Sequence, residues 1–265
     1  MKSILAAATL IALGTVSATA ADMAARPYTK AAPMMAPTWD WSGFYIGGNV
    51  GYGISRSPTD NALLAPTTPP TLFLGSSSSA SSDGVIGGGQ IGWNRMFAPS
   101  WLFGIEADIQ GADQKGRSVV DFSGLTGIPG SFTAVESRLN WFGTVRGRLG
   151  WTATPETLLY VTGGYAYGET EVRNSSNLSL FGAPVLAGSS VKSVKDGWTV
   201  GGGIETRLWN SNWTAKAEYL YLDLGSQGTA NLVGAAPNFI QASNVEFKDH
   251  IVRVGLNYKL GNWAY

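Results

Sequence analysis

Strict alternation of apolar and polar residues is the feature that most constrains this chain. Over residues 101–110 (WLFGIEADIQ), apolar side chains occupy every odd position from Trp101 to Ile109, whereas Glu106, Asp108 and Gln110 occupy even positions. Successive side chains of a β-strand point to opposite faces, so this pattern predicts a strand with one apolar and one polar face.

Seven further segments follow the same rule, and they make alternation a property of the whole chain. Their lengths are close to the roughly 9 to 11 residues that a tilted strand needs to cross a bilayer. The sequence therefore predicts an all-β fold of eight antiparallel strands. The seven segments are residues 41–53, 84–94, 139–151, 158–168, 197–208, 213–221 and 250–260.

The composition of the polar face separates a membrane barrel from a soluble sandwich, which would also alternate. Glycine shares the charged face, for example at Gly92, Gly104 and Gly203, and this suits the limited space inside a narrow cylinder. We therefore predict an eight-stranded transmembrane β-barrel with its charges inside. Because a charge held away from water requires a partner, these residues should form ion pairs. The predicted interior ion-pair residues are Glu106, Asp108, Arg146, Arg148, Glu205, Arg207, Lys216, Glu218 and Arg253.

The amino-acid composition indicates that part of the protein surface does not face water. Charged residues make up 14% of the chain, against roughly 25% in ordinary soluble domains. Aromatic residues collect at the segment ends, as in the girdles at the two membrane interfaces. The predicted interface aromatics are Trp41, Trp101, Trp141, Trp151, Trp198, Trp213 and Tyr258.

The connections alternate between long and short. Short turns are predicted near residues 98–100, 154–156 and 210–212, and long loops over 54–83, 112–138, 169–196 and 224–246. Membrane barrels have short periplasmic turns and longer extracellular loops. This order predicts four long extracellular loops and places both ends of the barrel in the periplasm.

The first 40 residues are predicted to precede the barrel. Residues 1–20 combine a positive start, an apolar run and Ala18-Thr19-Ala20, which together indicate a signal peptide. Residues 21–40 are rich in Pro and Ala and predict a flexible periplasmic segment. The predicted outer-membrane barrel domain then covers residues 41–265.

Composition also excludes several classes of function. The chain has no Cys and one His, so thiolate chemistry and zinc sites have almost no ligands, and we expect no cofactor and no metal. Lys plus Arg and Asp plus Glu each total 18, which gives no electrostatic reason to expect nucleic acid as a partner.

Several segments resemble the outer-membrane immunogenic protein family of alphaproteobacteria. They are WSGFYIGGNVGYG (41–53), GGGQIGWN (87–94), GTVRGRLGW (143–151), YVTGGYAYG (160–168), KAEYLYLDLG (216–225) and VRVGLNY (252–258), and the likeness covers about residues 41–260. The resemblance implies a small OmpA-like barrel of the porin family of outer-membrane proteins, a surface antigen that supports envelope integrity. It also implies outer-membrane lipid, lipopolysaccharide and the barrel-assembly machinery as partners. Some branches of the family are described as haem-binding surface proteins.

Two chain ends bear on this resemblance. Such barrels commonly end on an aromatic residue that points outward from the last strand and serves as an assembly signal. Here Tyr265 does not share the alternation that places Leu260 on the outward face. Either Gly261 makes a bulge that restores the alternation, or the assembly signal ends before Tyr265. Ala21-Asp22 resembles the mature start of relatives linked to peptidoglycan, which makes peptidoglycan a further possible partner.

Three motifs could each indicate a specific binding or catalytic site, but a purely structural explanation is stronger for all three. Residues 87–92 match a dinucleotide-binding glycine pattern, but a strand pattern runs through them where a helix would be needed. Glu106 and Asp108 could form an acid/base pair, although interior ion pairing explains them without a substrate. His250 could serve a rim hydrolase or ligate haem, yet no Ser is singled out beside it.

The sequence therefore predicts a protein that is not an enzyme: a structural, surface-exposed barrel of the Gram-negative outer membrane. A narrow porin and a haem-binding surface protein are the alternatives, and a rim hydrolase is the third. About eight strands leave an interior just wide enough for side chains, which disfavours a large aqueous pore.

Overall fold

The computed structural model describes residues 39–65, 67, 70–121, 123, 129–180, 183–233 and 239–261. The predicted signal peptide (1–20), most of the predicted periplasmic segment (21–40) and residues 262–265 of the C-terminal segment lie outside these residues. In the part that is described, no helix is long and apolar enough to cross a membrane.

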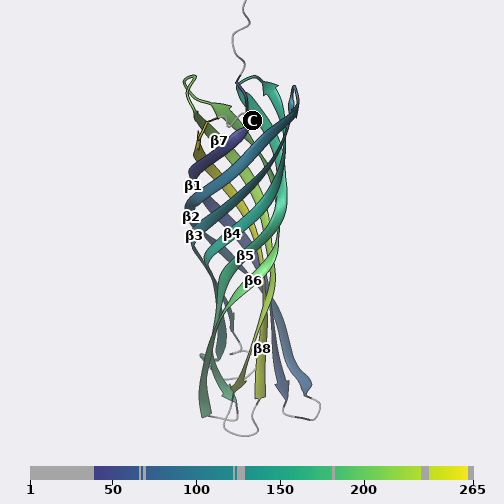
Figure 1. The fold of residues 1–265 in the computed structure, drawn as a ribbon. Helices are drawn as coiled ribbons and strands as arrows, with labels where there is room; N and C mark the ends of the chain where they lie inside the picture. Colours follow the sequence, from purple (N-terminus) through teal and green to yellow (C-terminus); the bar gives the residue numbers. More distant parts are fainter. Residues whose placement is uncertain are drawn as a thin grey trace, which may run out of the picture. The chain divides into compact units, whose positions relative to one another are not determined.

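Eight antiparallel strands form one closed barrel over the described residues (Figure 1). Each strand pairs with its neighbours in chain order, and β1 pairs with β8 to close the sheet. The predicted fold class is confirmed. The strands are β1 (Gly43–Ala65), β2 (Thr71–Ala98), β3 (Trp101–Asp121), β4 (Phe132–Thr154), β5 (Thr157–Leu180), β6 (Ala183–Arg207), β7 (Trp213–Val233) and β8 (Phe239–Lys259).

The two faces of the barrel wall follow the predicted alternation. On β3 the apolar face points outward, with Trp101 45%, Ile105 48% and Ile109 59% exposed, while Glu106 and Asp108 are buried. A continuous exposed apolar band of this kind would be unfavourable in water but matches the hydrocarbon of a bilayer.

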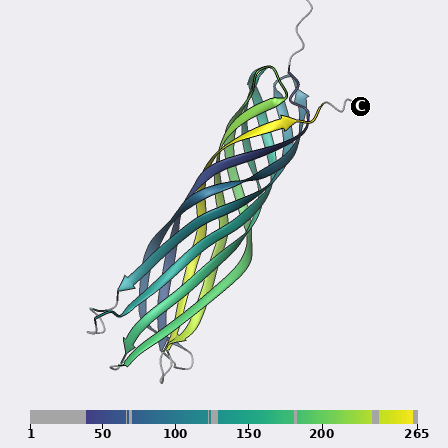
Figure 2. The same ribbon diagram turned by 90° about the vertical axis from the view of Figure 1, so that its left-hand side faces the viewer.

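Short turns and both described chain ends lie together at one end of the barrel, at the top of Figure 2. The turns are Pro99–Ser100, Pro155–Glu156 and residues 208–212, which agree with the three short connections predicted from the sequence. We call this the periplasmic end and the opposite one the outer end.

The four predicted long loops are mostly strand, which corrects the sequence prediction. The strands run for 21 to 28 residues, and at the outer end only residues 66–70, 122–131, 181–182 and 234–238 lie between them. The reason is the polarity of both faces in these parts: residues 75–82 of β2, for instance, read GSSSSASS. Without an apolar face a strand leaves no alternation for sequence patterns to detect.

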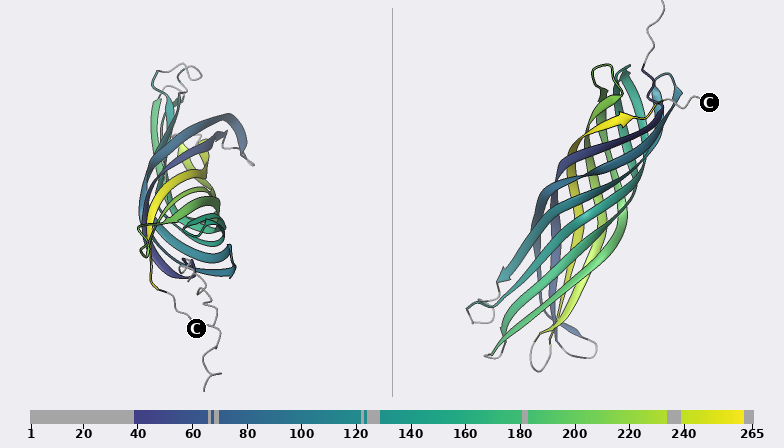
Figure 3. Two further views of the ribbon diagram at one scale, coloured as in Figure 1. Left: turned by 90° about the horizontal axis from the view of Figure 1, so that it is seen from above. Right: turned by 60° about the vertical axis from the view of Figure 1, so that its left-hand side comes forward.

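Beyond the closed barrel, the strands separate into two four-stranded sheets. Pairing of β2 with β3 ends at Ser82↔Gly116, and pairing of β6 with β7 ends at Trp198↔Asp223. We call this level the neck. The strands spread apart toward the outer end in Figure 1 and in the right-hand view of Figure 3. One sheet contains β7, β8, β1 and β2, and the other contains β3, β4, β5 and β6.

Polar side chains join the two sheets beyond the neck. Gln241 Nε2 of β8 donates to Thr133 Oγ1 of β4 at 3.2 Å, and Asn174 Nδ2 of β5 donates to Ser243 Oγ of β8 at 3.1 Å. These residues are buried between the sheets. The two sheets of the outer end are therefore held together by polar contacts, together with the buried apolar side chains Val135, Val172 and Val245.

Candidate functional site

Four carboxylates and four cations lie together inside the barrel, and each is at most 5% exposed. They come from β3, β4, β6, β7 and β8, and their charges sum to zero. The structure thus brings together eight of the nine predicted interior residues. The buried ionic layer consists of Glu106, Asp108, Arg146, Arg148, Glu205, Lys216, Glu218 and Arg253.

Two arginines connect strands from across the lumen. Arg146 of β4 contacts Asp108 Oδ2 at 2.8 Å, Glu218 Oε1 at 3.0 Å and also Glu106. Arg253 of β8 contacts Glu218 Oε2 at 2.6 Å and Asp108 Oδ2 at 3.0 Å. The Arg146–Glu218 pair joins β4 to β7 and the Arg253–Asp108 pair joins β8 to β3, which are not neighbouring strands, so these two ion pairs span the lumen.

Two tyrosines fill the rest of the ionic layer. Tyr45 Oη donates to Glu106 Oε2 at 2.7 Å, and Tyr160 Oη donates to Glu218 Oε1 at 3.1 Å. The Arg148 guanidinium lies 3.7 Å from the centre of the Tyr160 ring and also pairs with Glu205. A Cβ at Gly92 would lie 2.3 Å from the Tyr45 ring, so glycine is needed there for the tyrosine to enter the lumen.

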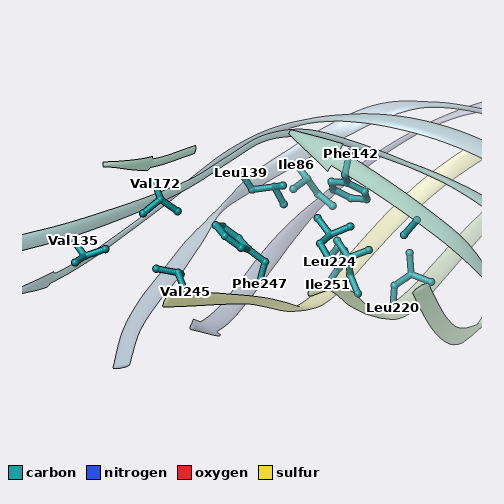
Figure 4. Packing of buried hydrophobic residues seen from close by; sticks show 12 residues of the cluster. Ile86, Val135, Leu139, Phe142, Val172, Leu220, Leu224, Val245, Phe247 and Ile251 are labelled. Atoms are coloured by element: carbon teal, nitrogen blue, oxygen red, sulfur yellow. The ribbon is translucent and has the colours of Figure 1, made fainter. Parts of the chain in front are cut away.

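Apolar layers cover the ionic layer on both sides. Toward the outer end, Phe142, Leu220, Leu224 and Ile251 are buried against one another, as Figure 4 shows, and Val135, Val172 and Val245 continue the cluster toward the outer end. Toward the periplasmic end, a second cluster is formed by Trp41, Leu102, Leu158 and Tyr160. Side chains therefore occupy the lumen at three successive levels.

Sequence patterns missed the outer apolar layer. Leu220, Leu222 and Leu224 have the parity of the predicted inward face, so apolar residues at inward positions were the available signal. Leu139 was predicted to face outward but is 5% exposed, and this is a correction. Its direction changes because the β4–β5 register shifts between Leu139 and Trp141, which inserts one residue into the alternation.

Arg207 is the one predicted interior cation that lies outside the ionic layer. It is the last residue of β6, and its guanidinium donates to Ser211 O at 2.9 Å and to Asn210 O at 2.6 Å. The same group lies 4.2 Å from the Trp39 ring. Because Arg207 lies at the end of a strand, the backbone carbonyl groups of the adjacent turn accept its hydrogen bonds. These contacts replace the ion pair that was expected inside the barrel.

Trp41 is also corrected, from the membrane interface to the barrel interior. It is 4% exposed, and its Nε1 donates to Pro155 O at 3.2 Å. Because Trp41 precedes the first strand residue, Gly43, strand alternation does not determine its direction, and it packs against Leu102 and Leu158.

The other predicted interface aromatics lie on the wall of the barrel. Trp101, Trp151, Trp198, Trp213 and Tyr258 are 37–51% exposed, and Trp141 is half-buried 6.0 Å from Tyr167. From Trp141 to Trp151 the chain advances ten residues, which is about 33 Å along a strand. A strand tilt of about 40° reduces this to roughly 25 Å, the height of a barrel's apolar band. Position and spacing thus agree with two membrane interfaces.

His250 lies on the outside of the wall near the outer interface. Its Nδ1 is 2.7 Å from Tyr219 Oη, and its ring meets the Tyr221 ring at 5.2 Å. Among the described residues, no group of three or more His, Cys, Asp or Glu could hold a metal ion. The contacts of His250 are therefore those of an interface aromatic cluster.

In the outer extensions, the exposed cations Arg173 and Lys192 pair with Glu171, whose side chain is 4% exposed. Arg173 donates from Nε to Glu171 Oε1 at 2.5 Å, and Lys192 Nζ lies 3.8 Å from Glu171 Oε2. The Arg173 hydrogen bond lowers the pKa of the Glu171 carboxyl. This charged surface differs sharply from the apolar band nearer the periplasm.

The family model that matches this chain is described as the outer membrane protein beta-barrel domain, and it matches residues 6–259. The chain is 38% identical to the 31 kDa outer-membrane immunogenic protein of Brucella melitensis, covering 98% of this chain and 100% of the relative. It is 28% identical to the 22 kDa outer membrane protein of Rhizobium leguminosarum, covering 72% and 68% of the two chains.

Solved structures give a looser likeness. The outer membrane protein OprG from Pseudomonas aeruginosa has a TM-score of 0.47 at 12% identity, covering 83% of this chain and 97% of that chain. The sequence matches are the stronger finding, and their names place these relatives in the outer membrane. This chain belongs to the outer-membrane β-barrel family and, within it, is a relative of the outer-membrane immunogenic proteins.

Proposed function

We propose that this protein is a structural, surface-exposed component of the outer membrane that supports envelope integrity and presents its outer sheets to the surroundings. The observation that carries the proposal is the buried ionic layer, in which charges from five strands neutralise one another across the lumen. A filled interior makes the barrel a stable anchor in the membrane. Its partners in this role are outer-membrane lipid and lipopolysaccharide around the wall, and the barrel-assembly machinery during insertion.

The narrow-porin alternative has less support. A solute crossing the lumen would have to displace ion pairs with contacts of 2.6 to 3.0 Å and also pass the apolar layers. Separating a buried ion pair costs about 3–5 kcal/mol when one partner is lost. At His250, Nδ1 contacts Tyr219 Oη, so haem binding or hydrolysis would have to use the other ring nitrogen.

The proposal is tested by deleting the gene in the source bacterium and measuring detergent sensitivity and release of outer-membrane vesicles. We expect both to rise and to return to normal with the full-length gene. A version with the outer extensions replaced by short turns separates anchoring from surface display, because it should restore the envelope but not surface recognition by antibodies. Unchanged sensitivity and vesicle release in the deletion strain would contradict the proposal.

Conductance of the purified barrel in planar bilayers tests the porin alternative separately. We expect no discrete openings above background. Regular openings whose size changes when Arg146 or Glu218 is substituted would favour the porin over the structural role.

A further inference from the structure

Asp249 of β8 is a buried carboxylate without a neutralising partner. It is 4% exposed, and the hydrogen-bond donors that face its carboxylate, the Gln114 side-chain amide and the His250 backbone N–H, carry no charge. The adjacent Lys248 does not neutralise it, because the Lys248 ammonium lies 2.6 Å from Glu246 on the outer surface. The four carboxylates of the ionic layer, in contrast, all contact cations.

A small cavity lies beside this carboxylate. Its volume is about 10 Å³, which is close to the space that one water molecule or one small ion requires, on the order of 10–15 Å³. Five strands contribute its polar lining. The polar residues are Ser55 of β1, Ser82 of β2, Gln114 of β3, Ser137 of β4, and Lys248 and Asp249 of β8; the apolar residues Leu139, Leu222, Leu224 and Phe247 complete the lining.

One serine at the cavity lacks a protein partner in the described part of the chain. Ser137 Oγ is buried without a hydrogen-bond partner and its residue is 2% exposed, whereas the Gln114 amide donates toward Asp249. Two glycines make room for the convergence. A Cβ at Gly53 would lie 1.7 Å from Gln114 Nε2 and 3.1 Å from Asp249 Oδ2, and one at Gly116 would lie 2.9 Å from Ser137 Oγ.

The position of the cavity would allow a bound ion to join the two sheets. The last β2–β3 pair is Ser82↔Gly116, so the cavity lies at the neck, where the closed barrel separates into two sheets. Ser55, Ser82 and Asp249 belong to strands of one sheet, and Gln114 and Ser137 belong to strands of the other. Whatever fills the cavity contacts both sheets.

We propose that this cavity binds one monovalent cation of the size of Na⁺, with the Asp249 carboxylate as the anionic ligand and serine oxygens as neutral ligands. A single carboxylate balances a single positive charge, and hard cations prefer oxygen ligands. An uncompensated buried carboxylate is costly, whereas a bound counter-ion neutralises it in place. The inference does not depend on the proposed envelope function.

The test measures thermal unfolding of the mature protein, folded in detergent, while NaCl replaces choline chloride at constant ionic strength. We expect the midpoint to rise with the logarithm of the Na⁺ concentration, by about 5–10 °C when the concentration is 100 times Kd. Asp249→Asn should remove this dependence. Asp83→Asn changes an exposed carboxylate and serves as the control, which should keep the wild-type dependence.

Ser137→Ala provides a second variant in case Asp249→Asn does not fold. It removes one neutral ligand, so it should shift the Na⁺ concentration required for half of the effect upward by several fold. The proposal is overturned if the wild-type midpoint is the same in NaCl and choline chloride. It is equally overturned if the unfolding midpoint of Asp249→Asn rises with Na⁺ as that of the wild type does. A wild-type midpoint that depends on pH between 5 and 8 but not on Na⁺ would also overturn it, because a proton would then neutralise Asp249.

Discussion

Replacing Arg146 with methionine should be one of the most destabilising single changes in the barrel. Methionine keeps an unbranched stem but removes the guanidinium that contacts Glu106, Asp108 and Glu218, the last two at 2.8 and 3.0 Å. The buried layer is then left with one excess negative charge. Loss of one partner from a buried ion pair costs about 3–5 kcal/mol. At about 2–4 °C per kcal/mol for a chain of this size, the unfolding midpoint should fall by roughly 6–20 °C.

The assay is reversible unfolding of the detergent-folded protein in denaturant, followed by tryptophan fluorescence, with heat-modifiable gel migration as an independent measure of the closed barrel. Arg117→Met is the matched control, because Arg117 pairs with Glu136 at 4.0 Å and its side chain is 62% exposed. An exposed pair contributes about 0–1 kcal/mol.

A double variant tests the electrostatic origin of the effect. Glu218→Gln alone leaves an excess positive charge, whereas Arg146→Met with Glu218→Gln restores neutrality. The double variant should therefore be more stable than the sum of the single effects predicts, by about 1–3 kcal/mol. Strict additivity, or a cost for Arg146→Met no larger than that for Arg117→Met, would refute the reasoning.

Two further predictions concern the wall and the outer sheets. Val145 lies on the lipid face near the middle of the apolar band, so Val145→Arg should lower the free energy of unfolding in lipid by about 2–4 kcal/mol. Val119→Arg, beyond the neck, should lower it by less than about 0.5 kcal/mol. Equal losses of stability for the two variants in reconstituted vesicles would argue against the assigned membrane level. Gln227→Leu removes hydrogen bonds that join β7 to β5 and β6. Amide hydrogen exchange over residues 183–197 should therefore accelerate about tenfold or more. Thr229→Val, on the same strand, serves as the control and should leave this exchange rate unchanged.

The membrane-embedded half of the fold could be predicted because its two faces differ in polarity. Where one face meets hydrocarbon and the other meets a charged lumen, residue parity determines the direction of the side chain, as for Glu106, Asp108, Arg146 and Arg148. The same reasoning predicted the number of strands and the periplasmic turns. Parity is thus a reliable signal only within the apolar band.

Four features escaped prediction for separate physical reasons. The outer extensions have polar residues on both faces, so their strands resemble loops in sequence. Leu139 changes face because one extra residue interrupts the alternation of β4. Trp41 and Arg207 lie at strand ends, where neighbouring backbone groups rather than pleating determine their contacts. The convergence at Asp249 depends on five strands meeting in register, which no local pattern contains.

The register of the ionic layer shows how a membrane barrel can carry so many charges inside. Two ion pairs lie directly across neighbouring strands, namely Glu106↔Arg146 and Glu218↔Arg253, and Glu205 lies opposite Lys216 in the register. Such pairs neutralise charge within adjacent strands, so the segments can enter the membrane before the barrel has closed. The contacts of Arg146 with Glu218 and of Arg253 with Asp108 join distant strands and can form only when the sheet closes. We therefore expect the opposite charges at facing register positions to lower the cost of insertion, and the contacts across the lumen to stabilise the closed barrel afterwards.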